Sequence, residues 1–366
     1  MDTAQILVVF GARPSVIKLA PVVHALRRRG ATVNVCHTGQ HGHMLECCLE
    51  PLGIEITHRL DASNGGLAFR LGTMTSALGT LLARNPHDAV VVVGDTVSGL
   101  VGALAGAFAG TPVAHVEAGL RTYCREPWPE EMTRKAIDSM ARWFFAPTQR
   151  AADNLEREGV DTKRVFVTGN TIVDALELMG QKRRRSPHPA VLITVHRREN
   201  WRGIEKITRQ VCGLADTHPN VAFRWPVHLN PAIREPVFRV CGRTPNISLL
   251  DPLPYGEFLG ELSRAWLVIT DSGGVQEESA TLGVPSVILR QVTERPEAVD
   301  AGVSVLAGGD FALLADAILR DDARRARMNR PSQCFGDGWA SERIAAIMLN
   351  GKASLVEPAE TKGPAA

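Results

Sequence analysis

Short apolar runs rich in β-branched residues alternate along the chain with stretches of helical character. Strands that are apolar throughout are typical of parallel sheets covered by helices on both faces. The runs lie at residues 6–10, 32–36, 90–93, 112–116, 143–146 and 164–168 in the first half, and at 190–195, 221–225, 247–251, 266–270 and 285–289 in the second. This order predicts an α/β fold with two doubly wound domains, which also suits a chain of 366 residues.

The break between the two predicted domains is a basic segment closed by prolines, QKRRRSPHP at residues 181–189. We therefore place an N-terminal domain at residues 1–178 and a C-terminal domain at residues 188–335. A glycine-rich run at residues 99–110 is too short to span a membrane and predicts a buried helix packed closely on a sheet. The last residues, 351–366, lack an apolar pattern and are expected to form a mobile tail.

Composition narrows the class of protein further. The formal net charge of +2 provides no electrostatic footprint for nucleic acid or an anionic membrane, so neither is expected as a partner. The seven cysteines form no CxxC pair and no zinc-like spacing with histidine, which argues against a disulfide framework and a metal site. The sequence has no signal-peptide pattern and no run of about 18 apolar residues. A cytoplasmic location without a bound cofactor is expected.

Three acidic residues stand where ligands of such folds bind. Asp95 and Glu117 follow two apolar strands, and Glu130 lies in the loop PWPEE. In open α/β sheets ligands bind beyond the carboxyl ends of the strands, so these carboxylates are expected to meet at one edge. Carboxylates placed there can exchange protons with a substrate. We expect burial to raise the pKa of at least one of them.

The segment DSGGVQEE follows a predicted strand of the second domain and opens a helix. Ser272 or Asp271 can cap this helix, while Gly273 and Gly274 let backbone N–H groups approach a diphosphate at the positive end of the helix dipole. Glu278 can accept hydrogen bonds from ribose hydroxyls. The alternative interpretation is a capped helix after a tight glycine turn.

Two cations, Arg13 and Lys18, lie at the start of a helix beside the end of the first strand. An arginine forms a two-pronged contact with phosphate, and a lysine offers a point charge. The alternative is that both side chains lie on the surface of the helix. No GxxxxGK motif occurs, so a phosphate-loop NTPase is not indicated.

A series of short segments, taken together and in order, carries a family resemblance. The segments are GARPSVIKLAPVVHAL, TGQH, GDT, HVEAGLRT, PWPEE, TGNTIVDAL, HRREN, PVHLNP, DSGGVQEE and TERPEAV. The chain resembles the non-hydrolysing UDP-N-acetylglucosamine 2-epimerases over residues 6–347. The resemblance implies two Rossmann-like domains of the GT-B type, a UDP-sugar in the cleft between them, and a homodimer. It also implies a last helix, at about 339–350, that returns to the first domain.

The resemblance further implies the residues of the site. The catalytic group of the family corresponds here to Lys18, Asp95, Glu117, Glu130 and His196. The UDP site corresponds to Arg13, Phe258 through its backbone, Ser272, Gly273, Gly274 and Glu278. A second, activating UDP-sugar site of bacterial members corresponds to Gln40, His41, His43, Glu131, Arg197 and His228. For His228, the capping of a turn is the alternative.

The reaction that the resemblance implies inverts C2 of the sugar. UDP is eliminated across C1–C2, and UDP and a proton then return to the glycal on the other face, which interconverts UDP-N-acetylglucosamine and UDP-N-acetylmannosamine. Arg13, His196 and the glycine amides would neutralise the leaving diphosphate. The three carboxylates would exchange protons with C2.

The chain departs from the family pattern on the first-domain side of the cleft. Ser15 stands where glutamate is usual, Thr133 where asparagine is usual, and Glu126 where serine is common, in a loop one residue shorter. Gly42 and His43 replace an arginine and a polar or acidic residue. These departures keep open a hydrolase that releases free sugar, or a glycosyltransferase that acts on a small acceptor. A non-catalytic UDP-sugar sensor is disfavoured, because all three carboxylates are retained.

Overall fold

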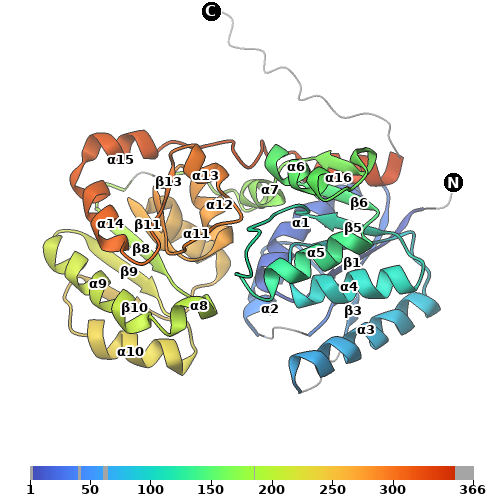
Figure 1. The fold of residues 1–366 in the computed structure, drawn as a ribbon, viewed down its shortest axis with the longest axis horizontal. Helices are drawn as coiled ribbons and strands as arrows, with labels where there is room; N and C mark the ends of the chain where they lie inside the picture. The colour runs from blue at the N-terminus through green and yellow to red at the C-terminus, as the bar shows by residue number, and fades with distance from the viewer. Residues whose placement is uncertain (1–2, 40–42, 61–64, 185, 351–366) are drawn as a thin grey trace, which may run out of the picture.

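The computed structural model describes residues 3–39, 43–60, 65–184 and 186–350. Two parallel sheets lie side by side, each flanked by helices (Figure 1). The predicted α/β architecture of two doubly wound units is therefore confirmed. The tail expected at 351–366 lies outside the described residues.

The N-terminal sheet has seven strands in the order β3-β2-β1-β4-β5-β6-β7. Its strands are β1 Gln5–Phe10, β2 Thr32–His37, β3 His58–Arg59, β4 Ala89–Val93, β5 Val113–Val116, β6 Trp143–Ala146 and β7 Val165–Val167. Its helices are α1 Arg13–Arg28, α2 His43–Leu49, α3 Leu67–Arg84, α4 Val97–Phe108, α5 Glu130–Met140, α6 Gln149–Arg157 and α7 Thr171–Leu178, with the 3₁₀ turn η1 Thr162–Arg164. Strand β1 pairs with both β2 and β4, so the strand order reverses there. Ligands of such sheets bind beyond the strand ends at this point.

The C-terminal sheet has six strands in the order β10-β9-β8-β11-β12-β13. Its strands are β8 Ala190–Thr194, β9 Ala222–Pro226, β10 Ile247–Leu250, β11 Leu267–Thr270, β12 Ser286–Ile288 and β13 Ser304–Leu306. Its helices are α8 Arg198–Trp201, α9 Ile204–Thr217, α10 Pro231–Cys241, α11 Tyr255–Arg264, α12 Gly273–Leu282, α13 Glu297–Asp300, α14 Phe311–Arg320 and α15 Asp322–Met328. Strand β8 pairs with β9 and β11, which gives a second reversal point.

Every predicted strand is present, and its ends differ from the prediction by at most one residue. Two edge strands are absent from the prediction. Strand β3 has only two residues, both polar, so it produces no apolar run. Strand β13 is also short, with three residues.

The glycine-rich run forms α4, which packs closely on the N-terminal sheet as predicted. A Cβ atom built on Gly102 would lie 2.6 Å from Cγ1 of Val92, and one built on Gly106 would lie 2.9 Å from Cγ2 of Val113. Real Cβ atoms do not approach so closely, so only glycine permits this distance between helix and sheet. The N-terminus of α4 is capped by Thr96, whose hydroxyl accepts a hydrogen bond from Gly99 N at 3.1 Å.

The connection between the two sheets lies against the C-terminal sheet's helices. Arg184 N donates to Ser263 O at 3.0 Å, and the guanidinium of Arg183 donates to Asn329 Oδ1 at 3.0 Å. The last helix, α16 Ala340–Asn350, packs on α1 and α7 beside the N-terminal sheet (Figure 1). Asp174 of α7 fixes its start, because Asp174 Oδ1 accepts Ser341 N at 2.7 Å.

One apolar cluster runs through the contact between the two units. It joins Ile172 and Leu176 of α7 to Tyr255 and Leu259 of α11 and to Val275 of α12. Burying these side chains fixes the base of the space between the sheets. Among the described residues, no helix is both long and apolar enough to cross a membrane.

Candidate active site

A cavity of about 170 Å³ lies where the carboxyl ends of the two sheets face each other. Both units contribute to its wall. The lining residues are Pro14, Ser15, Lys18, Val93, Gly94, Asp95, Thr96, Glu117 and Glu130 from the N-terminal unit, and His196, Arg197, Ser272, Gly273, Gly274, Glu294 and Arg295 from the C-terminal unit. All five residues of the predicted catalytic group, and three of the predicted UDP group, therefore line one cavity.

Glu117 follows β5 with its backbone in the left-handed region, at φ 65°. Gly94 after β4 has a φ of 63°, and a Cβ atom there would lie 3.0 Å from Glu117 Oε2. A glutamate in this region is strained, and such strain is concentrated at functional sites. The glycine leaves the space into which the Glu117 carboxylate turns.

The Glu117 carboxylate is surrounded by cations from both units. It forms an ion pair with Lys18 of α1, and its Oε1 lies 2.9 Å from Nη2 of Arg295. Burial works to raise the pKa of Glu117, but the charges of Lys18 and Arg295 outweigh it and lower the pKa to about 2. Glu117 is therefore ionised at neutral pH.

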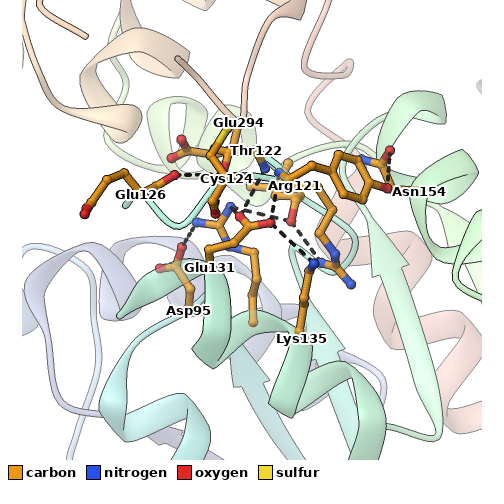
Figure 2. A network of polar contacts seen from close by, with 12 residues as sticks. Asp95, Arg121, Thr122, Cys124, Glu126, Glu131, Lys135, Asn154 and Glu294 are labelled. Carbon is orange, nitrogen blue, oxygen red and sulfur yellow. Dashed lines mark hydrogen bonds and ion pairs between the residues drawn. The ribbon is translucent and has the colours of Figure 1, made fainter. Parts of the chain in front are cut away.

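Asp95 is paired with Arg134, a buried arginine of α5. The same guanidinium lies 3.1 Å from Glu131, which in turn accepts the backbone N–H groups of Thr122 at 3.0 Å and Tyr123 at 3.1 Å. Figure 2 shows Asp95, Glu131 and Thr122 within this network. Arg134 thus joins the Asp95 carboxylate to the loop that leads to Glu130.

Glu130 begins α5 and has no cation as an ion-pair partner among the described residues. Burial raises its pKa above the ordinary value, and the nearby charge of Asp95 adds to this effect. The expectation of a raised pKa in the carboxylate group is met at Glu130. At Glu117 the charges of the paired cations lower the pKa instead.

The glycine turn before α12 faces the same cavity. Ser272 caps the helix by accepting a hydrogen bond from Val275 N at 3.4 Å. A Cβ atom on Gly273 would lie 2.5 Å from Nη1 of Arg295, so the guanidinium rests directly on this residue. The backbone N–H groups at a helix N-terminus and an arginine beside them form a site suited to phosphate.

Asp271, the other residue predicted to cap α12, accepts hydrogen bonds from the loop after β8. It is fully buried and accepts the backbone N–H groups of His196 at 3.1 Å and Arg197 at 2.9 Å, and Nδ2 of Asn200 at 2.9 Å. These bonds fix the loop between β8 and α8 and present the imidazole of His196 to the cavity. Desolvation lowers the pKa of His196 against the opposing charge of Asp271.

The other residues of the predicted UDP group lie near this helix. Glu278 is buried in α12, where Oε1 accepts the Tyr255 hydroxyl at 2.9 Å. Burial raises the pKa of Glu278 to about 7, and the charge of Arg13 opposes this rise. Phe258 of α11 packs in the apolar cluster, and its backbone N–H donates to Pro254 O at 2.9 Å.

Sequence reasoning missed several charged residues of the site. Arg295 contacts three carboxylates, those of Glu117, Glu277 and Glu294. Glu277 also lies 2.7 Å from Lys18. The only sequence signal was their presence in DSGGVQEE and TERPEAV. Nothing in that pattern shows that these charges are buried against one another.

Half of the residues predicted for a second ligand can be placed with their side chains. Gln40 and His41 lie outside the described residues, as does the side chain of His43. Glu131 belongs to the Arg134 network, and Arg197 lines the main cavity. His228 Nδ1 accepts Asn230 N at 3.0 Å, which is the alternative turn-capping role. A second ligand site therefore stays a prediction.

Comparison with known proteins decides the family. A sequence profile of UDP-N-acetylglucosamine 2-epimerase matches residues 24–349. The UDP-N-acetylglucosamine 2-epimerase of Escherichia coli strain K12 is 39% identical over 375 residues, which cover 96% of this chain and 100% of the relative. The chain belongs to the UDP-N-acetylglucosamine 2-epimerase family.

Solved structures of 2-epimerases agree with this membership. The UDP-GlcNAc 2-epimerase from Neisseria meningitidis, bound to UDP-GlcNAc, is 34% identical with a TM-score of 0.89, over 94% of this chain and 100% of that one. The enzyme from Methanocaldococcus jannaschii, in complex with UDP-GlcNAc and UDP, is 31% identical with a TM-score of 0.83, over 96% and 100% of the two chains. MurG from Acinetobacter baumannii, 14% identical with a TM-score of 0.59, shares the GT-B-like fold alone.

Three departures from the 2-epimerase pattern belong to the described part of the N-terminal unit, whereas Gly42 and the side chain of His43 lie outside the described residues. Ser15 lines the cavity itself, and Thr133 is buried in α5. Glu126 is tied within its own loop, since Oε2 accepts Trp128 N at 3.0 Å and its backbone carbonyl accepts the Thr122 hydroxyl at 2.8 Å. None of these three changes removes a carboxylate of the predicted catalytic group.

Proposed function

We propose that this chain reversibly interconverts UDP-N-acetylglucosamine and UDP-N-acetylmannosamine by inverting C2 of the sugar. The observation that carries the proposal is the cavity itself, which sets three carboxylates of the N-terminal unit opposite the glycine turn of α12. The full-length likeness to the 2-epimerase of E. coli, and to the N. meningitidis structure with UDP-GlcNAc bound, supports the same substrate.

The diphosphate of the substrate is placed at the N-terminus of α12. Gly273 and Gly274 offer backbone N–H groups there, and the guanidinium of Arg295 rests on Gly273. Glu278, further along the same helix, is placed to accept the ribose hydroxyls, and Arg13 supplies positive charge near it. Charge-assisted contacts of this kind stabilise the negative charge that grows on UDP as it leaves.

The chemistry is an elimination followed by an addition. A base removes the C2 proton while the bond from C1 to the UDP oxygen breaks, and UDP leaves with the electron pair as C1 and C2 form a double bond. Addition then returns UDP to C1 and a proton to the opposite face of C2. Two groups that exchange protons with the two faces of the sugar are therefore required.

The three carboxylates are suited to different parts of this task. Glu130, whose pKa is raised, is proposed to carry the proton that is delivered. Glu117, paired with Lys18 and Arg295, and Asp95, paired with Arg134, are proposed as proton acceptors. A carboxylate with a pKa of about 2 is a weak base, but a diphosphate beside Gly273 competes for Arg295 and so raises the pKa of Glu117.

Three further features belong to the same proposal. A second, activating UDP-sugar would use Gln40, His41, His43, Glu131, Arg197 and His228. The active form is proposed to be a homodimer, following the family resemblance. A cytoplasmic location is proposed because Cys36, Cys124, Cys212, Cys241 and Cys334 are thiols outside any disulfide, as is usual in a reducing compartment.

The experiment is to incubate the protein with UDP-N-acetylglucosamine in deuterated water and to follow the sugar by NMR. The expected result is a mixture of both 2-epimers, with deuterium at C2 of the recovered UDP-sugar. The family matches support this outcome and not a hydrolase or a glycosyltransferase. Free sugar without deuterium in the remaining UDP-sugar, or transfer only after a small acceptor is added, would overturn the proposal.

A further inference from the structure

Two cations and two carboxylates form a closed ring at the base of the cavity. Lys18 contacts Glu117 and lies 2.7 Å from Glu277 Oε2. Arg295 contacts Glu277 through Nε and lies 2.9 Å from Glu117 through Nη2. Lys18 and Glu117 come from the N-terminal unit, and Glu277 and Arg295 from the C-terminal unit. Each charge thus has two opposite charges as neighbours, one of them across the cleft.

Glu277 is the member of this ring that has no role in the proposed reaction. Its side chain is 0% exposed, and it is not part of the cavity wall. It also accepts Nδ2 of Asn170 at 2.9 Å, and Asn170 is the residue that caps the start of α7. Glu277 therefore reaches from α12 into the N-terminal unit at two points, Lys18 and Asn170.

The charges of the ring depend on one another. Burial works to lower the pKa of Lys18, but the charges of Glu117 and Glu277 outweigh it and raise the pKa. Burial likewise raises the pKa of Glu277, while Arg295 and Lys18 oppose the rise. Without Glu277, Lys18 would have Glu117 as its one carboxylate neighbour among the ions of the ring, and Arg295 would keep Glu117 and Glu294. Removing one partner from a buried set of ions leaves an uncompensated charge, which is costly.

We propose that Glu277 is a positioning residue of the 2-epimerase: from α12 it holds Lys18 and Arg295 so that both meet Glu117 across the cleft. This inference rests on the proposed function. Glu277 touches neither the sugar nor UDP. It acts through the two cations, and through them it sets where the Glu117 carboxylate stands relative to the glycine turn that receives the diphosphate.

A positioning role for Glu277 predicts that its substitution lowers turnover but leaves UDP binding nearly unchanged. The backbone N–H groups of Gly273 and Gly274 do not depend on Glu277 for their chemistry. The charge of Glu277 helps to raise the pKa of Glu278, so its removal favours the ionised form of Glu278 that is proposed to bind the ribose. Lys18 and Arg295 stay positively charged neighbours of the diphosphate when Glu277 is neutral. Proton transfer, in contrast, requires Glu117 within hydrogen-bond reach of C2, and a shift of about 1 Å in a reacting group costs about 100-fold in rate.

The test compares Glu277→Gln and Glu277→Asp with the wild-type protein. Glutamine keeps the shape and removes the charge, whereas aspartate keeps the charge and shortens the reach. We expect kcat for epimerisation to fall about 10- to 100-fold in E277Q and less in E277D, with the Kd for UDP within about threefold of the wild type. Calorimetry measures the UDP affinity, and NMR of the UDP-sugar measures turnover.

The matched control is Asp300→Asn. Asp300 and Arg150 form another ion pair between the two units, 2.7 Å long, but both side chains are more than half exposed. Exposed pairs contribute about 0–1 kcal/mol, so D300N is expected to keep the turnover and melting temperature of the wild type. A fall in turnover shared by D300N would assign the effect to any loss of charge between the units.

The outcomes are distinct. Wild-type turnover in E277Q or E277D overturns the positioning role, while the wild-type protein still epimerises. If E277Q does not fold, the test relies on E277D, which retains the carboxylate. Turnover of E277D equal to that of the wild type then overturns the positioning role. Equal losses of turnover and UDP affinity also contradict the inference, since they indicate general damage to the site. A wild-type protein that leaves C2 unchanged overturns the proposed function itself.

Discussion

Glu117 Oε1 and Arg295 Nη2 lie 2.9 Å apart, one from the end of β5 and the other from the loop after β12. This ion pair crosses the cleft and joins a candidate proton-transfer group to a cation of the diphosphate site. A buried ion pair of this kind is weak evidence for stability, because desolvation offsets much of the attraction. Its position instead couples the arrival of a diphosphate to the charge environment of Glu117.

Neutralising any one of the three carboxylates is expected to reduce turnover far more than UDP binding. Asp95→Asn, Glu117→Gln and Glu130→Gln each remove a proton-transfer group, for which losses of about 100- to 10,000-fold in kcat are typical. UDP affinity, measured by calorimetry, should change little, because the helix N-terminus stays intact. Glu156→Gln, on the exposed face of α6, is the control and should behave as the wild type. Near-normal kcat in all three variants would remove proton transfer from these residues.

Arg134→Met is expected to lower both stability and turnover. The Arg134 side chain is 2% exposed and bridges Asp95 and Glu131, so its loss leaves Asp95 without its cation and Glu131 with only the distant ammonium of Lys135. Breaking a buried ion pair from one side costs about 3–5 kcal/mol, which denaturant unfolding can measure. Arg134→Lys keeps the positive charge but not the two-pronged shape of the guanidinium. Its stability and turnover should lie between those of the wild type and Arg134→Met. The control is Lys135→Ala: the Lys135 side chain is 44% exposed, and its ammonium group lies 4.0 Å from Glu131.

Most of the fold follows from the sequence because the strands are buried on both faces. A run such as Val90 to Val93 has no polar position, so strand identity and ends are both well marked. The two-residue strand β3 shows the limit, since His58 and Arg59 carry no apolar signal and gain their pairing only from the neighbouring strand β2.

The candidate site was predictable where it depends on strand ends and motifs. Asp95 and Glu117 line one cavity because the parallel strands β4 and β5 end at one edge, and Ser272 caps α12 as its type and position indicate. The partners of these residues were not predictable. Arg295 contacts Gly273 because the loop after β12 folds back over α12. The local sequence does not indicate this tertiary contact.

Gly102→Ala is expected to destabilise the protein although it adds only a methyl group. The new Cβ atom would lie 2.6 Å from Val92 Cγ1, so α4 must move away from the sheet. Overpacking of this kind costs about 1–3 kcal/mol in unfolding free energy. Gly79→Ala on α3 is the matched control, since nothing lies within 4 Å of its Cβ position. There the substitution should stabilise by about 0.5–1 kcal/mol through helix propensity. Equal effects at the two positions would contradict the close packing of α4.

Glu278→Ala is expected to weaken UDP binding. The carboxylate is buried in α12 and is proposed to accept the ribose hydroxyls, for which a charge-assisted hydrogen bond contributes about 1.5–3 kcal/mol. This corresponds to about a 10- to 150-fold rise in the Kd measured by calorimetry. Tyr255→Phe removes the hydroxyl that donates to Glu278 and leaves the carboxylate, so its effect should be smaller. An unchanged Kd for E278A would show that Glu278 does not bind the ribose.

Glu278 should also make the unliganded protein less stable as the pH rises. Burial raises its pKa to about 7 in the folded state, whereas an unfolded glutamate titrates near 4.5. Between these values the folded state holds a proton that the unfolded state has released, so stability is fully present below about pH 4.5 and is lost as the pH rises through 7.

At about 1.4 kcal/mol for each unit of pKa shift, the loss reaches at most about 3.5 kcal/mol. The check is denaturant unfolding of the wild type and Glu278→Gln from pH 5 to pH 8. Glutamine keeps a neutral side chain at every pH, so the variant should lack this part of the decline and be the more stable protein, relative to wild type, at pH 8. Glu257→Gln, an exposed glutamate on α11, controls for the general loss of a charge. Parallel curves for wild type and E278Q would mean that Glu278 titrates as an ordinary carboxyl group.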